Sequence, residues 1–219
     1  MAVAYDTQTT VFNYGATQTA TLTVGSNSNR ILVAIFCYTG TSANKVTAIS
    51  YSAGSGGTWT RLGGAQCSNI ITSVEIWYSI APSTGSVTVS PTFTGTADFL
   101  FTCASFYNAD QTTGMNGFAS SDGSVSVSIT TTSGDYAVAG IIKTASPDPI
   151  TAGTVMGSGG TDQIERTGRA AASGSSTTIA WTTNTIYTMT AGGNVIQAAA
   201  SSLIANPLRG PVDLLGFIN

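Results

Sequence analysis

Histidine is absent from this 219-residue sequence, and with it the most common general base of enzymes. Its absence excludes the Ser-His-Asp and Cys-His arrangements of nucleophilic catalysis. Three dispersed cysteines lack the ligand spacing of a zinc site. The sequence has no GxxxxGK[ST] loop and no GxGxxG that follows a strand and opens a helix. We therefore expect a protein that is not an enzyme and has no catalytic residue, cofactor or metal.

Charged residues are also few in this sequence. Only 8% of the residues are charged, against roughly 25% in an average soluble domain. The seven Lys and Arg residues are scattered, whereas a nucleic-acid backbone or an anionic membrane surface requires several in a cluster. No apolar run approaches the roughly 18 residues of a membrane helix. We expect neither nucleic acid nor membrane as a partner.

Short apolar and alternating segments make up most of the chain. The runs 31–38, which is the most apolar in the chain, 71–80 and 99–107 predict the central strands of a sheet. Other segments alternate polar and apolar residues, and Gly- or Pro-rich turns separate about a dozen strands at roughly 8–12-residue spacing. We predict an all-β fold, a single antiparallel, jelly-roll-like β-sandwich over residues 1–200. Pro91, inside the segment 86–94, indicates an edge strand or a bulge there.

The three cysteines are Cys37, Cys67 and Cys103, an odd number that cannot pair completely within one chain. Cys37 and Cys103 fall inside apolar strand segments, where a free cysteine behaves as a small hydrophobic residue. We predict buried free thiols, with one disulfide bond as the alternative.

Carboxylates are the remaining candidates for acid–base chemistry. Glycoside hydrolysis requires two of them across a cleft, and the only glutamates are Glu75 and Glu165. Strand alternation places Val74 and Ile76 on one face and Glu75 with Trp77 on the other. This pattern predicts that Glu75 faces solvent on an amphipathic strand; the alternative is an acid or a sugar-binding group.

Four loop aspartates offer oxygen ligands of the kind that calcium prefers, but without EF-hand spacing. They are Asp110, Asp122, Asp148 and Asp162. Hydrogen bonds to their own turn backbones explain single loop aspartates as well, and we predict no metal.

Three tryptophans, Trp59, Trp77 and Trp181, lie in predicted strands. A tryptophan in a strand is usually part of a core, and the alternative is a platform on which a sugar stacks. A glycan is therefore a possible partner.

The last segment, 201–219, differs from the rest in its prolines and its high share of apolar residues. It either packs on its own sandwich or docks on a neighbouring subunit as an assembly arm. The residues that we expect to make the arm's contacts are Leu203, Ile204, Leu208, Val212, Leu214, Leu215, Phe217 and Ile218.

Several segments together resemble a β-sandwich module found in bacterial extracellular proteins and phage structural proteins. The most telling are the WY-x-x-x-P-x-x-G hairpin at 77–85 and DQTT at 110–113, within a similarity that spans roughly residues 18–197. The resemblance implies a jelly-roll-like sandwich without catalytic activity, so it transfers no active-site residue.

These observations favour a structural protein at the outer surface of a virus particle, such as a phage capsid decoration or fibre subunit. The segment MAVAYDTQTT at 1–10 has neither the basic region nor the apolar core of a signal peptide, and virion proteins leave the cell by lysis. Expected partners are copies of the chain and another virion protein. The alternatives are a carbohydrate-binding or adhesive module of a secreted bacterial protein, and a subunit of a cellular surface filament or layer.

Overall fold

A computed structural model describes residues 1–39, 45–52, 57–68, 72–143, 149–159, 164–182 and 187–199. In these ranges the chain forms fifteen β-strands and no helix, so the predicted all-β class is confirmed. Accordingly, the described part contains no helix long and apolar enough to cross a membrane.

The strands fall into two consecutive groups along the chain. The first group is β1 (Ala4–Thr17), β2 (Ala20–Val24), β3 (Ile31–Thr39), β4 (Val46–Tyr51), β5 (Trp59–Gln66), β6 (Thr72–Ile80) and β7 (Gly85–Tyr107). The second group is β8 (Met115–Asp122), β9 (Ser126–Thr130), β10 (Tyr136–Lys143), β11 (Ile150–Ala152), β12 (Thr154–Gly159), β13 (Ile164–Ala171), β14 (Ser176–Trp181) and β15 (Thr188–Val195).

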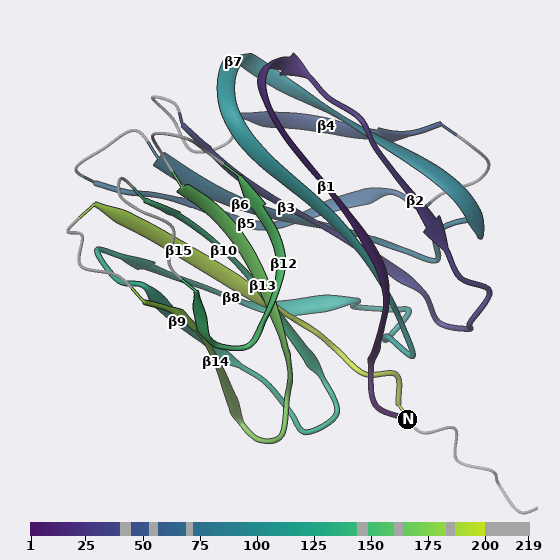
Figure 1. The fold of residues 1–219 in the computed structure, drawn as a ribbon. Coiled ribbons are helices and arrows are strands. Elements are labelled where there is room, and N and C mark those ends of the chain that lie inside the picture. Colours follow the sequence, from purple (N-terminus) through teal and green to yellow (C-terminus); the bar gives the residue numbers. More distant parts are fainter. Residues whose placement is uncertain are drawn as a thin grey trace, which may run out of the picture.

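In the first group, which we call the first half, five strands form a large antiparallel sheet in the order β1-β7-β3-β6-β5. The N-terminal part of β7 bends away and pairs with β2 and β4 instead. These three segments form a leaf that covers the outer face of the large sheet (Figure 1).

The second half repeats this plan. Its large sheet has the order β12-β13-β10-β15-β8, and a separate three-stranded sheet, β11-β14-β9, covers its outer face. When β8 to β13 are matched with β1 to β6, and β14 and β15 with the two parts of β7, both strand orders become identical. The chain therefore contains an internal structural repeat.

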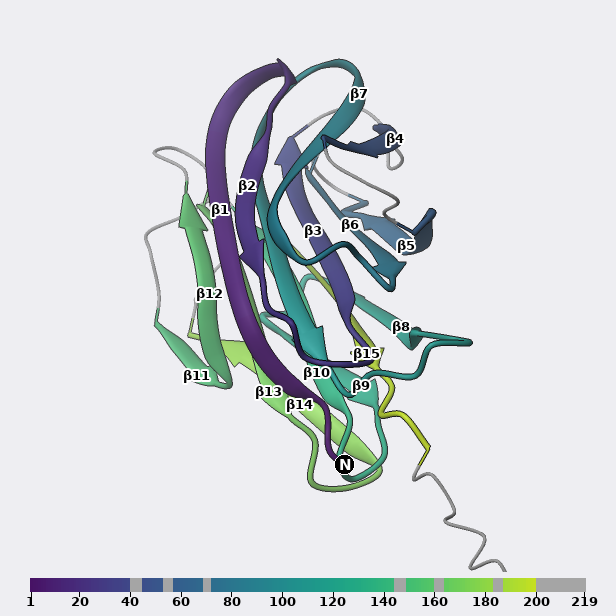
Figure 2. The same ribbon diagram turned by 90° about the vertical axis from the view of Figure 1, so that its right-hand side faces the viewer.

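The two large sheets pack face to face as a sandwich (Figure 2). β3 lies against its counterpart β10, β1 lies against β12, and β5 lies against β8. The contact between β1 and β12 is equivalent to the contact between β8 and β5, because β8 is the counterpart of β1 and β12 is the counterpart of β5. This is the arrangement that two identical subunits adopt in an isologous dimer.

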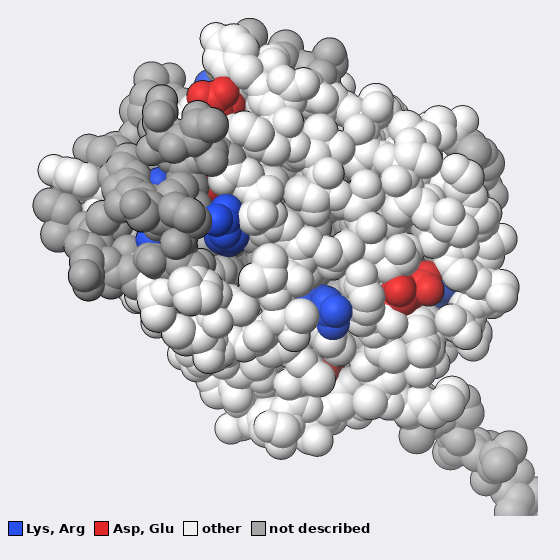
Figure 3. Space-filling model, in the orientation of Figure 1, with Lys and Arg blue, Asp and Glu red and all other residues white. Residues whose placement is uncertain are grey.

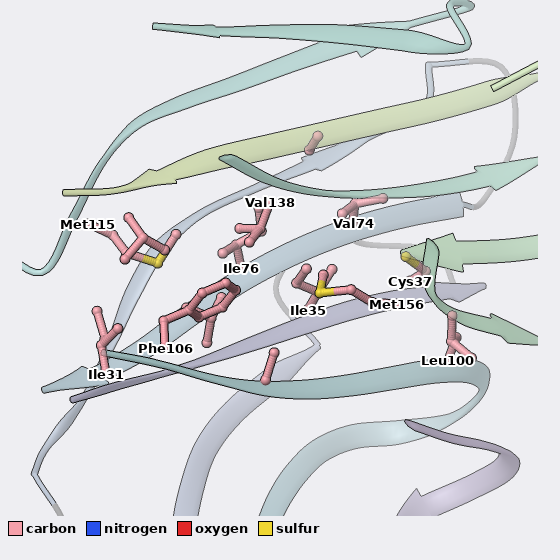
Figure 4. Close-up of a cluster of buried hydrophobic side chains, with 14 of the residues drawn as sticks. Ile31, Ile35, Cys37, Val74, Ile76, Leu100, Phe106, Met115, Val138 and Met156 are labelled. Carbon is pink, nitrogen blue, oxygen red and sulfur yellow. The ribbon is translucent and has the colours of Figure 1, made fainter. Parts of the chain in front are cut away.

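The central core fills the space between the two large sheets (Figure 4). Ile31, Ile35 and Cys37 point into it from β3, and Val138 and Met156 approach from the other sheet. Alternate residues of the same strands point outward into two further cores beneath the leaves. Both faces of each large sheet are thus covered, which explains why β3 and β10 are buried along almost their whole length.

The predicted central strands are confirmed, since β3 lies between β6 and β7. The prediction of separate strands at 86–94 and 99–107 is wrong, because both belong to β7. Pro91 is not on an edge: it is buried and paired with Ile49 of β4. It lies between the part of β7 that pairs with β2 and the part that pairs with β1, where the β1–β7 register also shifts.

All three cysteines are buried, and none forms a disulfide bond, as predicted. Burial, followed by the charge of Glu165, raises the pKa of Cys37 well above its usual value. Burial also raises the pKa of Cys103. These thiols therefore lack the lowered pKa that makes a cysteine a nucleophile.

Candidate functional site

Glu75 lies on the face of β6 opposite Val74 and Ile76, as the alternation predicts. Its side chain nevertheless has no exposed surface, so the prediction that it faces solvent is wrong. The sequence pattern correctly separated the two faces of the strand. It could not reveal that a leaf formed by distant segments would cover the second face.

Hydrogen bonds satisfy the buried carboxylate of Glu75 completely. Oε1 accepts from the Tyr38 hydroxyl and from the Val46 backbone N–H at 3.3 Å. Oε2 accepts from Arg61 Nε at 3.0 Å, which is also an ion pair, and from Trp77 Nε1 at 3.2 Å. Four donors and one guanidinium charge hold this group in place. Its role is therefore to join β3, β4, β5 and β6 rather than to transfer protons.

Glu165 is the other buried glutamate, and its environment is the opposite. Neither carboxylate oxygen has a hydrogen-bond partner within the described ranges, and its exposed fraction is 0%. Burial, reinforced by the charge of Asp98 and opposed by Arg166 and its own backbone, raises the pKa of Glu165 to about 8. The carboxyl is therefore mostly protonated at neutral pH.

The two glutamates do not form a catalytic pair. Glu165 has the same strand parity as Thr167, whose hydroxyl lies 2.9 Å from the Thr102 hydroxyl across the central core. Glu75 lies on the outer face of the first large sheet. The sheet itself stands between the two carboxyls, so no cleft brings them to one substrate.

Two of the four loop aspartates lie in the described ranges. Asp110 Oδ1 accepts from the N–H groups of Thr112 at 2.9 Å and Thr113 at 2.7 Å, the Asx-turn alternative to a metal site, and these bonds lower the pKa of Asp110. Asp122 Oδ2 accepts from Ser68 N at 2.8 Å, and hydrogen bonds from Cys67 and Ser68 lower its pKa. The other two, Asp148 and Asp162, lie outside the described residues. The described acidic residues and cysteines form no group of three that could hold a metal.

The tryptophans belong to the cores. Trp181 is 3% exposed beneath the second leaf. Trp59 and Trp77 are half-buried against the core beneath the first leaf, and Trp59 stacks on Tyr51 with ring centroids 5.3 Å apart.

A polar pocket of about 310 Å³ lies where β8 and β10 begin and β9 and β15 end. We call its buried lining residues the floor: Thr131, Asp135 and Asn194. We call its exposed lining residues the rim: Asn116, Thr130 and Thr132. Gln197, Ile196 and Gly117 complete the wall. This pocket is the candidate functional site.

The floor is built around the carboxylate of Asp135. Oδ2 accepts from Asn194 Nδ2 at 2.7 Å and from Thr132 N at 2.9 Å, while Oδ1 accepts from a single donor among the described residues, Gln197 N at 2.9 Å. An ionised carboxylate offers about four acceptor positions, so one on Oδ1 remains. Asn194 Nδ2 also donates to Asn116 Oδ1 at 3.2 Å, and Asn194 Oδ1 has no partner in the described part of the chain.

Local sequence explains the pocket's shape. A tight turn at 131–134 ends β9 and starts β10; Asp135 N donates to Thr132 O at 3.0 Å across it, and Gly134 adopts a φ of +97°. Gly117 has a φ of +64°, and a Cβ there would lie 3.0 Å from Thr130 O. The sequence pattern alone did not identify Asp135 as a site residue. The available signal was Asn194, the one amide side chain of the strand TMTAGGNV.

The eight residues predicted to form an assembly arm, Leu203, Ile204, Leu208, Val212, Leu214, Leu215, Phe217 and Ile218, lie outside the described residues. The prediction about the arm therefore remains untested.

Comparison with known proteins gives no relative: no protein-family profile, curated protein sequence or solved structure matches this chain. The sequence and the geometry described above are thus the basis for inferring function.

Proposed function

We propose that this chain is a non-enzymatic structural subunit of the outer surface of a virus particle, of the capsid-decoration or fibre type. In this role it associates with copies of itself and with another virion protein, through its sandwich and through the segment 201–219. Its place of action is the virion surface.

The observation that carries this proposal is the nearly uncharged surface. Few Lys, Arg, Asp or Glu atoms appear on the face drawn in Figure 3. Exposed hydroxyls pair across strands instead, as Thr21 with Thr88 at 2.8 Å and Ser128 with Thr178 at 2.9 Å. With a formal net charge of −3, electrostatic repulsion between copies is weak, so they can pack side by side at high local density.

A second consideration is where the potential acid–base groups lie. Glu75 is bonded to four donors, Glu165 is enclosed in the central core, and the three thiols are buried. Each has a packing role in the fold, and this favours a structural over an enzymatic function.

Light scattering on the full chain and on a chain ending at Ala200 tests the proposal. We expect the full chain to form an oligomer and the shortened chain to be a folded monomer. A second variant keeps the length but carries Leu214→Ser, Leu215→Ser, Phe217→Ser and Ile218→Ser; a matched control carries Asn206→Ser and Asn219→Ser. A monomeric full chain, or an oligomer that survives both changes, would contradict the proposed arm.

The alternatives differ in what such an experiment reveals. A carbohydrate-binding or adhesive module of an extracellular protein can act as a monomer. Because Trp181 is buried and Trp59 and Trp77 are half-buried against a core, such a module would use the polar pocket rather than those rings. A subunit of a cellular filament or layer would share the dependence on 201–219, and would extend into open chains rather than closed oligomers.

A further inference from the structure

We propose that the polar pocket at the end of the second half binds a single ring of an uncharged, hydroxyl-rich ligand, a monosaccharide unit. This inference does not depend on the proposed virion role, because a surface protein of any origin can carry such a site.

The floor and the rim present both kinds of hydrogen-bonding group that a sugar requires. The remaining acceptor position on Asp135 Oδ1 can accept a hydrogen bond from a sugar hydroxyl. On the rim, Thr130, Thr132 and Asn116 are exposed residues, and the hydroxyl or amide of each can donate to a sugar oxygen. A sugar hydroxyl both donates and accepts, so it can bond to floor and rim together.

The composition of the lining disfavours other ligand classes. No Lys or Arg lines the pocket, and the Asp135 carboxylate repels anions such as phosphate or sulfate. No aromatic residue lines it either, so a nucleobase or an aromatic ligand would have no stacking partner. Calcium takes six to eight oxygen ligands, whereas Asp135 is the one carboxylate in the lining and three of its acceptor positions are occupied.

Size also fits a single ring. A volume of about 310 Å³ lies at the lower end of the roughly 300–1,000 Å³ of small-molecule sites. Ile196 supplies one apolar wall against which the C–H groups of a sugar ring can pack.

The corresponding place in the first half is filled differently. Arg30 precedes β3 as Asp135 precedes β10, and Ser105 pairs with β3 where Asn194 pairs with β10. Arg30 donates from Nη1 to Asn27 O at 2.7 Å and from Nε to Pro82 O at 3.2 Å. In the first half, a guanidinium bonded to backbone carbonyls thus stands where the second half has the carboxylate of Asp135. The first half therefore lacks the hydrogen-bond acceptor that the proposed sugar site requires, and it serves as a control for binding within the same chain.

The experiment uses the full ¹⁵N-labelled chain. D-glucose, D-galactose, D-mannose and N-acetyl-D-glucosamine are titrated separately into the millimolar range, and calcium chloride is titrated in parallel. We expect at least one sugar to shift the amide signals of Asn116, Thr132 and Gln197 in a saturable way. Signals around Arg30 should not move.

Two variants and a control connect the shifts to the pocket. Thr130→Trp places an indole on the rim and should abolish binding, whereas Thr23→Trp, on an exposed position of β2, should leave it unchanged. Asn116→Ala removes one rim donor and should weaken binding about tenfold; it carries the test if Thr130→Trp does not fold.

Three results would overturn the inference: no sugar shifts the pocket signals, calcium chloride shifts them in place of a sugar, or the rim variants bind as the wild type does. Any of these outcomes leaves the light-scattering test of self-association unaffected, so the two proposals can fail separately.

Discussion

The two halves share a strand order but fill it with different side chains. Beneath its leaf, the first half packs a chain of aromatic rings: Phe36 stacks on Phe101 with centroids 4.7 Å apart, and Phe93 stacks on Phe99 at 4.5 Å. The described residues of the second half are small and aliphatic there, with Trp181 as the one large ring among them. The same topology therefore tolerates two different cores, because alternation and volume matter more to a sandwich than the identity of each side chain.

The strand registers allow the two halves to be compared residue by residue. Phe36 pairs with Phe101, and their counterparts Ile141 and Thr190 pair in the second half. Trp77 pairs with Ala34, whereas its counterpart Gly168 pairs with Ala139. Where the first half has a large ring, the second half brings its leaf close to the backbone; a Cβ at Gly168 would lie 3.3 Å from Ile179 Cγ2. Each half thus reaches close packing by its own combination of sizes.

Removing Glu75 should have the largest effect, because it breaks a network present in the first half. Glu75→Gln leaves Arg61 without its carboxylate in a half-buried position. We expect a loss of about 3–5 kcal/mol in the free energy of unfolding, measured by urea denaturation. Arg166 occupies the corresponding place in the second half, since Glu75 pairs with Phe36 and Arg166 with Ile141.

Arg166→Ala is the matched control for that experiment. The Arg166 guanidinium donates to the backbone carbonyls of Glu165 at 2.9 Å and Gly159 at 3.3 Å. We expect a loss of about 1 kcal/mol. Equal losses in both variants would mean that Glu75 and Arg166 contribute equally to the free energy of unfolding. The different side chains at the two positions would then have no effect on stability.

The sequence predicted the fold class because the relevant signal is local. Alternation along 45–52 and 124–130 and the apolar runs of 31–38 and 99–107 indicate strands and their buried faces without any knowledge of their neighbours. The internal repeat was not visible, because large residues in one half face small ones at the matching positions of the other. Only pairing and strand order reveal it.

The candidate site was less predictable for a related reason. Asp135, Asn116 and Asn194 are far apart in the sequence, and each has an ordinary explanation as a turn or surface residue. They come together because β8, β10 and β15 are neighbours in the second large sheet. Burial of Glu75 was missed likewise, since the covering leaf is formed by segments before and after it. Non-local pairing decides both outcomes.

The buried carboxyl of Glu165 makes the stability of the central core, which joins the two halves, dependent on pH. The folded state raises its pKa from 4.5 to about 8, so folding favours the protonated form. Its contribution to stability is therefore complete below about pH 4.5 and declines as the pH rises toward 8. We expect thermal or urea unfolding to show a decrease of about 2–4 kcal/mol across this window.

The first half supplies the variant that sharpens this test. Val74 pairs with Cys37 of β3 at the position where Glu165 pairs with Ile142 of β10. Glu165→Val transfers the first half's residue into the second and should abolish the dependence on pH between 5 and 8. A wild-type protein whose stability is flat across this window, or a variant with the same slope as wild type, would show that Glu165 is not the titrating group.

The smallest effect should come from the surface, where the two leaves are most alike. Thr21→Ala removes the exposed hydroxyl that pairs with Thr88, and Ser128→Ala removes the one that pairs with Thr178. Cross-strand pairs of this kind contribute about 0.2–1 kcal/mol, so we expect similar small losses from both substitutions, measured by urea denaturation. A large loss in one leaf alone would mean that its hydroxyls stabilise that leaf specifically. Equal small losses would show that these hydroxyls contribute little to the free energy of unfolding, so the stability of the fold alone does not explain the uncharged Ser/Thr surface.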